Sequence, residues 1–141
     1  MNSLEKYEVI RKYLINDDKI KSLLTITVEN KNVVCIFTAE KPKKVTADNY
    51  VIMKMKELSG GYIMADQVEF DIIGKNISKL LPVKDRIIEL LDDPKNTKTI
   101  KNENVTILTS ELVNGGGIAK NTETNNFSII IYFKIQTEGE C

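Results

Sequence analysis

The chain has 141 residues, of which 42% are hydrophobic and 28% are charged, and its 20 basic residues balance 20 acidic ones. This length and composition predict one folded domain over residues 1–141 and exclude a disordered chain. A formal net charge of zero argues against binding nucleic acid through its phosphates, because such proteins are normally basic. Residues 1–60 carry 11 basic and 8 acidic side chains, and residues 61–141 carry 9 and 12, a division that favours head-to-tail contact between subunits.

The two cysteines show no spacing typical of a metal site or a redox motif. Cys35 lies in the apolar run 33–37 and is predicted to be a buried free thiol, and Cys141 is the last residue. No disulfide framework is expected, as in a reducing cytoplasm. The N-terminus lacks the layout of a signal peptide, and no apolar stretch reaches the roughly 18 residues of a membrane span.

The N-terminal segment predicts two helices separated by a short break. Ser3 is a candidate N-cap, since its hydroxyl can accept from an amide of the first turn. The polar residues 16–18 end the first helix and cap a second one over residues 19–24. The apolar residues of the first helix recur at helical spacing: Leu4, Tyr7, Ile10 and Leu14.

From residue 25 the apolar period changes to two, which is typical of strands. Residues 25–28 and 33–37 predict a hairpin around the polar turn 29–32. A loop follows over residues 39–44, because Pro42 cannot donate to a strand ladder and lysines surround it.

A second antiparallel hairpin is predicted from strand 50–56, the glycine turn 59–61 and strand 68–72. Alternate residues of both strands are apolar, which predicts that one face of each is buried. The residues expected on that face are Val51, Met53, Met55, Val68, Phe70 and Ile72.

Residues 76–92 predict the strongest helix of the chain, with Pro82 as its awkward residue. An interior proline removes one backbone hydrogen bond and clashes with the preceding turn. The regular helix is therefore expected to begin at Leu81 or Pro82. The apolar face comprises Ile77, Leu80, Leu81, Ile87, Ile88 and Leu91.

The C-terminal part predicts a strand at 104–113, a glycine-rich loop at 114–126 and a last strand at 127–136. In the last strand Ile130 and Tyr132 lie on the face opposite the main apolar face. Two apolar faces indicate a central strand, or an outer face covered by a partner. The main apolar face comprises Phe127, Ile129, Ile131, Phe133 and Ile135.

These elements predict an α+β fold with the order α-α-β-β-β-β-α-β-β. A mainly antiparallel sheet of about four to six strands packs against the N-terminal helix and the amphipathic helix of residues 76–92. No internal repeat or low-complexity tract interrupts this pattern.

Catalytic equipment is missing from the sequence. The absence of histidine excludes histidine triads, histidine general bases and most zinc sites. Residues 114–117 resemble an anion-binding glycine loop, but such a loop normally leads into a helix and this one lies between strands. No enzyme activity, cofactor or metal is therefore expected.

Two groups of charged residues are candidate sites. Glu69 and Asp71 share a strand face, a separation that suits acid–base or metal chemistry, but nothing nearby completes a site. A solvated strand face is the preferred interpretation. Basic residues at 41, 43 and 44 lack the interleaved aromatic residues of a nucleic-acid site, so we interpret them as a solubilising loop.

The order and size of these elements carry further information. The segments that mark this order of elements are residues 7–14, 20–24, 50–52, 67–72, 87–91 and 127–133. Over residues 4–136 this pattern resembles the tail terminator (tail completion, neck) proteins of tailed bacteriophages and of phage-tail-like bacteriocins. Pro82 departs from the pattern, since an uninterrupted helix is expected there.

The resemblance implies a structural protein of the virion tail or neck, made in the bacterial cytoplasm. Such proteins form a ring, usually a hexamer, that stops polymerisation of the tail tube and meets the head-side connector. The implied partners are copies of the same chain, the tail tube protein, the head-side connector protein and, in a contractile tail, the sheath protein. Neither nucleic-acid binding nor a membrane is implied.

The resemblance supplies no catalytic residues, so the candidate interface is inferred from the long polar loops and the second apolar face. The residues assigned to it are Lys41, Lys43, Lys44, Asn114, Gly115, Gly116, Gly117, Ile130 and Tyr132.

Three other functions remain open at this stage. Another head–tail connector or a tube protein has a similar size, and a tube protein would form long tubes rather than one ring. A monomeric α+β module would carry a concave apolar pocket. An enzyme would need carboxylate or lysine chemistry in a cleft.

Overall fold

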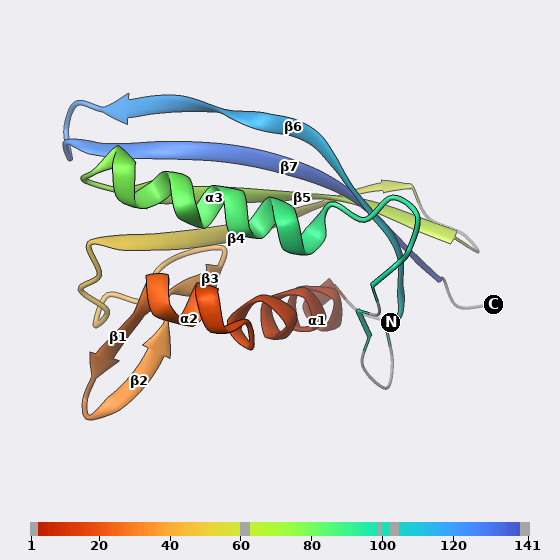
Figure 1. The fold of residues 1–141 in the computed structure, drawn as a ribbon, viewed down its shortest axis with the longest axis horizontal. Coiled ribbons are helices and arrows are strands. Elements are labelled where there is room, and N and C mark those ends of the chain that lie inside the picture. The colour runs from red at the N-terminus through yellow and green to blue at the C-terminus, as the bar shows by residue number, and fades with distance from the viewer. Residues whose placement is uncertain (1–2, 60–62, 99, 102–104, 139–141) are drawn as a thin grey trace.

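The computed structural model describes residues 3–59, 63–98, 100–101 and 105–138 (Figure 1). The elements are α1 (Ser3–Ile15), α2 (Asp18–Leu24), β1 (Thr25–Val28), β2 (Lys31–Val34), β3 (Ile36–Thr38), β4 (Asn49–Ser59), β5 (Ile63–Gly74), α3 (Ile77–Leu91), β6 (Ile107–Asn121) and β7 (Asn126–Glu138). The predicted α+β class is confirmed. None of these helices is long and apolar enough to cross a membrane.

One five-stranded sheet dominates the described chain, with the strand order β3-β4-β5-β7-β6. Its pairs are antiparallel except for the parallel pair β3–β4. The strands β1 and β2 form a separate hairpin that projects from the body (Figure 1). The long strand β7 lies between β5 and β6, as its two apolar faces predicted.

Five strands precede α3, whereas the sequence predicted four. The predicted strand 33–37 is two strands, because the chain passes from one sheet to the other at Cys35. The Cys35 amide donates to the Leu24 carbonyl beside the hairpin, and its own carbonyl accepts from the Val51 amide of β4. Cys35 itself is buried and free, as predicted.

The core lies between one face of the sheet and the three helices. Phe70 of β5 and Phe133 of β7 meet edge to face, with ring centroids 5.7 Å apart. Fully burying each such large apolar side chain contributes about 1.5–3 kcal/mol. The predicted buried positions Val51, Met53, Val68, Phe70, Ile72, Ile129, Ile131, Phe133 and Ile135 are confirmed, and Met55 and Phe127 are partly buried.

The start of α2 agrees with the prediction from the sequence, and the start of α3 does not. Asp17 caps α2, as expected, by accepting from the Ile20 amide, and it also accepts two hydrogen bonds from Arg86 of α3. The regular part of α3 begins at Ile77, earlier than predicted, and Pro82 lies inside it. The Asn76 cap and the buried Leu80 hold the first turn, so the missing proline amide is tolerated.

The C-terminal hairpin also corrects the prediction. The glycine-rich segment 114–117 is part of β6, which continues to Asn121, and the turn occupies only residues 122–125. Three bulges in β6 absorb the extra residues, and two of them fall within residues 112–117. Of the other predicted features, Cys141 and the glycines of the turn 59–61 lie outside the described residues.

A buried ion pair joins α1 to the sheet. Lys6 Nζ lies 2.8 Å from Asp66 Oδ2, and the two side chains are only 5% and 7% exposed. In the same helix the Tyr7 hydroxyl accepts from the Met55 amide, and Arg11 donates to the Ile36 carbonyl. The amphipathic pattern did not predict the ion pair between Lys6 and Asp66, because a lysine in a helix is normally solvated.

Replacing Lys6 alone should destabilise the fold strongly. Lys6→Met leaves the Asp66 carboxylate buried without its partner, which typically costs about 3–5 kcal/mol in the free energy of unfolding. The double variant Lys6→Met/Asp66→Leu should recover most of that loss, because no uncompensated charge remains. Urea denaturation measures both, and a single-variant cost no larger than that of Lys12→Met, at an exposed lysine of the same helix, would contradict the importance of the pair.

Candidate functional site: the open face of the sheet

The helices cover one face of the five-stranded sheet, and no described helix covers the other face. We call this second face the open face. Its side chains come from alternate positions of β4, β5 and β7, the positions that do not face the helices. Toward β3 the connection 39–48 covers part of it, where Phe37 and Ile52 are buried. The rest of the open face carries Tyr50, Lys54, Lys56, Gln67, Glu69, Asp71, Ile73, Ser128, Ile130, Tyr132 and Lys134.

A charged cluster occupies the middle of the open face. Lys54 Nζ lies 3.0 Å from Asp71 Oδ2 and 3.7 Å from Glu69 Oε2. The register of β5 and β7 places Tyr132 opposite Glu69 and Ile130 opposite Asp71. The lysine side chain is 53% exposed, whereas the carboxylates are 24% and 13% exposed. The acidic groups are thus largely withdrawn from solvent and one lysine compensates part of their charge.

The electrostatics of the cluster follow from this geometry. A hydrogen bond shared with Asp71, together with burial and the Asp71 charge, raises the pKa of Glu69 above that of a free glutamate. The hydrogen bond to Asp71 likewise raises the pKa of Lys54. The Glu69 charge raises the pKa of the Tyr132 hydroxyl. Asp71 Oδ1 is buried and accepts no hydrogen bond within the described chain.

This cluster does not form a metal site within the part of the chain that the structure describes. No group of three or more potential His, Cys, Asp or Glu ligands occurs there. The lysine between the carboxylates occupies the position where a cation would bind. The arrangement is therefore that of a partly compensated polar patch flanked by the half-buried Ile130 and Tyr132.

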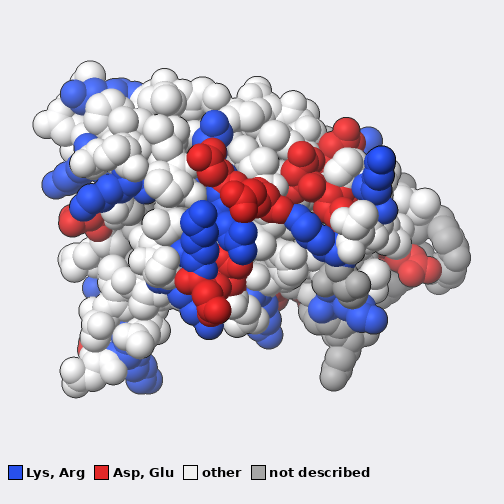
Figure 2. Space-filling model, in the orientation of Figure 1, with Lys and Arg blue, Asp and Glu red and all other residues white. Residues whose placement is uncertain are grey.

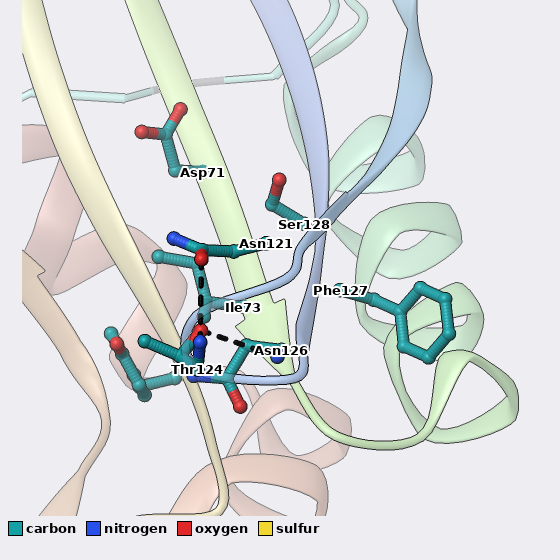
Figure 3. Close-up of a pocket in the computed structure, with 8 residues that line it drawn as sticks. Asp71, Ile73, Asn121, Thr124, Asn126, Phe127 and Ser128 are labelled. Atoms are coloured by element: carbon teal, nitrogen blue, oxygen red, sulfur yellow. Dashed lines mark hydrogen bonds between the residues drawn. The ribbon is translucent and has the colours of Figure 1, made fainter.

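One shallow pocket opens at the end of the open face nearest the β6–β7 turn (Figure 3). Its volume is about 230 Å³, below the 300–1,000 Å³ typical of ligand pockets. In Figure 3 the turn residues Asn121, Thr124 and Asn126 bond mainly to one another, because Asn121 and Thr124 accept from nearby backbone amides. The pocket is lined by Tyr50, Asp71, Ile73, Asn121, Thr124, Asn126, Phe127 and Ser128.

The predicted interface residues fall into two groups. Asn114 pairs with Tyr132 and Gly117 with Ile130, so the β6 and β7 candidates are brought together. The lysine loop lies apart from them, at the β3–β4 side of the sheet. Its first lysine is already engaged, since Lys41 donates to the Val45 carbonyl and lies over the Tyr50 ring, 5.4 Å from its centroid. Lys43 and Lys44 are exposed.

Sequence reasoning did not assign Tyr50, Lys54 and Ile73 to this face. The alternation in strand 50–56 does place Lys54 on the face of the strand away from Val51 and Met53, and this pattern could have assigned it. It did not show that β5 pairs with β7 as well as with β4, and this pairing is what assembles the cluster.

Comparison with known proteins adds a fold relationship. No protein-family model and no curated protein sequence matches the chain. The structure is similar to a chain in the virion of a native gene transfer agent (GTA) particle, with a TM-score of 0.67 and 11% sequence identity. The similarity covers 92% of each chain. At this identity the relationship is one of fold.

The raised pKa of Glu69 predicts a pH-dependent stability. In the window above the unfolded pKa of about 4.3, the folded chain binds more protons than the unfolded chain, so stability falls as pH rises. Glu69→Gln should remove this contribution and flatten the curve. Urea denaturation between pH 4 and pH 8 measures it. An exposed control, Glu123→Gln, should retain the wild-type slope, and an unchanged slope in Glu69→Gln would contradict the assignment.

Proposed function

We propose that this chain is a structural virion protein of the tail terminator kind. In this role copies of the chain form a ring, usually of six, on the last ring of the tail tube. The ring stops tube polymerisation and offers its other side to the head-side connector. The observation that carries the proposal is a sheet with one open face, on which Ile73, Ile130 and Tyr132 are half-buried, in a fold similar to that of a chain of a GTA virion.

The open face supports assembly for an energetic reason. Ile73, Ile130 and Tyr132 are half-buried in the single chain, so a neighbour that covers them removes apolar surface from water at about 25 cal/mol per Å². The compensated cluster beside them lowers the cost of desolvating the two carboxylates. A head-to-tail contact between subunits forms a ring when the rotations that relate successive subunits add up to a full turn.

The same observations weigh on the alternatives. A connector or tube protein shares the need for an assembly surface, and the mode of polymerisation separates it from a terminator. A monomeric ligand-binding module gains little support from shallow pockets of about 230 Å³ beside Tyr50 and about 300 Å³ beside Tyr13. We propose a non-enzymatic role, with the carboxylates of the open face serving in packing rather than in acid–base chemistry.

Light scattering of the purified chain, alone and mixed with its own tail tube protein, tests this function. The expected result is the mass of a closed ring, either in the sample of the chain alone or only in the sample that also contains the tube protein. A chain that stays monomeric in both samples would refute the proposal, and one that polymerises without limit would indicate a tube protein.

Charged substitutions on the open face should block assembly without unfolding the chain. Ile130→Lys and Tyr132→Lys place an amino group where the proposed neighbour packs, so the ring fraction should fall at least about tenfold, equivalent to about 1.4 kcal/mol. Leu81→Lys is the matched control, because Leu81 is an exposed apolar residue of α3. Rings that form equally well from all three variants would contradict the use of the open face.

A further inference from the structure

The strand β6 forms one edge of the five-stranded sheet, and only its first half is covered. The Asp93 amide donates to the Ser110 carbonyl, and the Leu112 amide donates to Asp92 Oδ1. Beyond Leu112 no other described backbone pairs with the outer side of β6. We call residues 113–119 the free edge.

The free edge lacks two of the three features that normally prevent strand pairing. Soluble proteins protect an edge strand with charged residues, proline or bulges. Bulges are present here and Lys120 follows near the end of β6, but the sequence of residues 113–119, VNGGGIA, contains neither a charge nor a proline. Val113 and Ile118 are each 60% exposed. Figure 2 shows few charged side chains over the middle of β6 along the top of the molecule, and basic side chains toward its end at the β6–β7 turn.

The three glycines of the free edge differ in what the single chain requires of them. Gly116 has a φ of +98°, and a Cβ there would lie 2.9 Å from the Ile130 carbonyl oxygen, so the fold requires glycine at this position. At Gly115 and Gly117 a Cβ would meet nothing within 4 Å, and neither has a positive φ.

Glycine in a strand is nevertheless unfavourable, because it loses more backbone entropy on folding than other residues. It often marks a bulge, as here, or a position where another backbone approaches closely. The bulged strand requires glycine only at position 116, so Gly115 and Gly117 leave room for an approaching backbone that the isolated chain does not contain.

A second copy of the chain offers a matching strand. The β1–β2 hairpin is short, and β1 pairs only with β2 among the described strands. A two-stranded hairpin is marginally stable alone, so a third strand would stabilise it. The residues of β1, TITV, are uncharged, and the hairpin lies at the opposite side of the molecule from β6 (Figure 1).

Charge does not oppose this occupant. The hairpin residues 25–34 carry one acidic and one basic side chain, Glu29 and Lys31, and the free edge carries none. A contact between them is heterologous, the type that produces rings.

We propose that the free edge of β6 pairs with the β1–β2 hairpin of a neighbouring copy, with Gly115 and Gly117 allowing the two backbones to approach. This proposal rests on the proposed ring and names a contact that builds it. Covering the free edge would also bury Val113 and Ile118.

The first test separates assembly from folding. Gly115→Val/Gly117→Val should leave the melting temperature unchanged or higher, because valine favours extended backbone, while the ring fraction falls at least tenfold. Glu111→Val, in the covered half of β6, should form rings normally. Gly116→Ala should lower the melting temperature. This result would show that the fold requires glycine at position 116 but not at positions 115 and 117. A double glycine variant that is folded and still forms wild-type rings overturns the proposal.

The second test identifies the occupant, in a Cys141→Ser background that leaves only the buried Cys35. Mixing Ile118→Cys protein with Thr27→Cys protein under assembly conditions should give a disulfide-linked dimer. A dimer from Ile118→Cys protein alone, or a link to the tube protein instead, overturns the hairpin as the partner. A wild-type chain that forms no ring refutes the proposed function itself, whereas wild-type rings without the cross-link refute only this contact.

Discussion

The pairing of β5 with β7 is the constraint on which the rest of the structure depends. Twelve residue pairs join these strands, from Ile63 opposite Glu138 to Gly74 opposite Phe127. One face of the pair supplies the centre of the core, where Phe70 meets Phe133, and the helices are anchored over it. The other face holds the cluster of Lys54, Glu69 and Asp71 with its apolar neighbours. Because strand residues alternate between faces, the register that builds the core also fixes the composition of the open face.

Covering the sheet from one side leaves two surfaces that the single chain does not satisfy. One is the open face, with the half-buried Ile73, Ile130 and Tyr132, and the other is the β6 edge beyond Leu112, where backbone groups and exposed apolar side chains meet solvent. A monomeric protein normally avoids both features. In a ring of identical subunits, repeated heterologous contacts would cover both surfaces. This burial is the physical basis of the proposed assembly role.

The sequence predicted much of this architecture and missed the parts that depend on distant pairing. Strict alternation gave the buried faces of β4, β5 and β7, and Asp17 gave the cap of α2. The break at Cys35 was missed, because only the partners of its flanking strands reveal it. The glycines at 114–117 suggested a loop, since glycine usually marks one, whereas bulges in a paired strand use the same residues. The burial of Lys6 was missed because its partner, Asp66, lies 60 residues away.

Negative-stain electron microscopy of assembled tail tubes would test the central claim most directly. Tubes grown from the tail tube protein would be compared with and without this chain carrying a gold-binding tag. The proposed function predicts label at one end of each tube, together with tubes that stop growing at the labelled end. Label distributed along the tube wall, or tubes that lengthen at both ends without any label, would contradict the account.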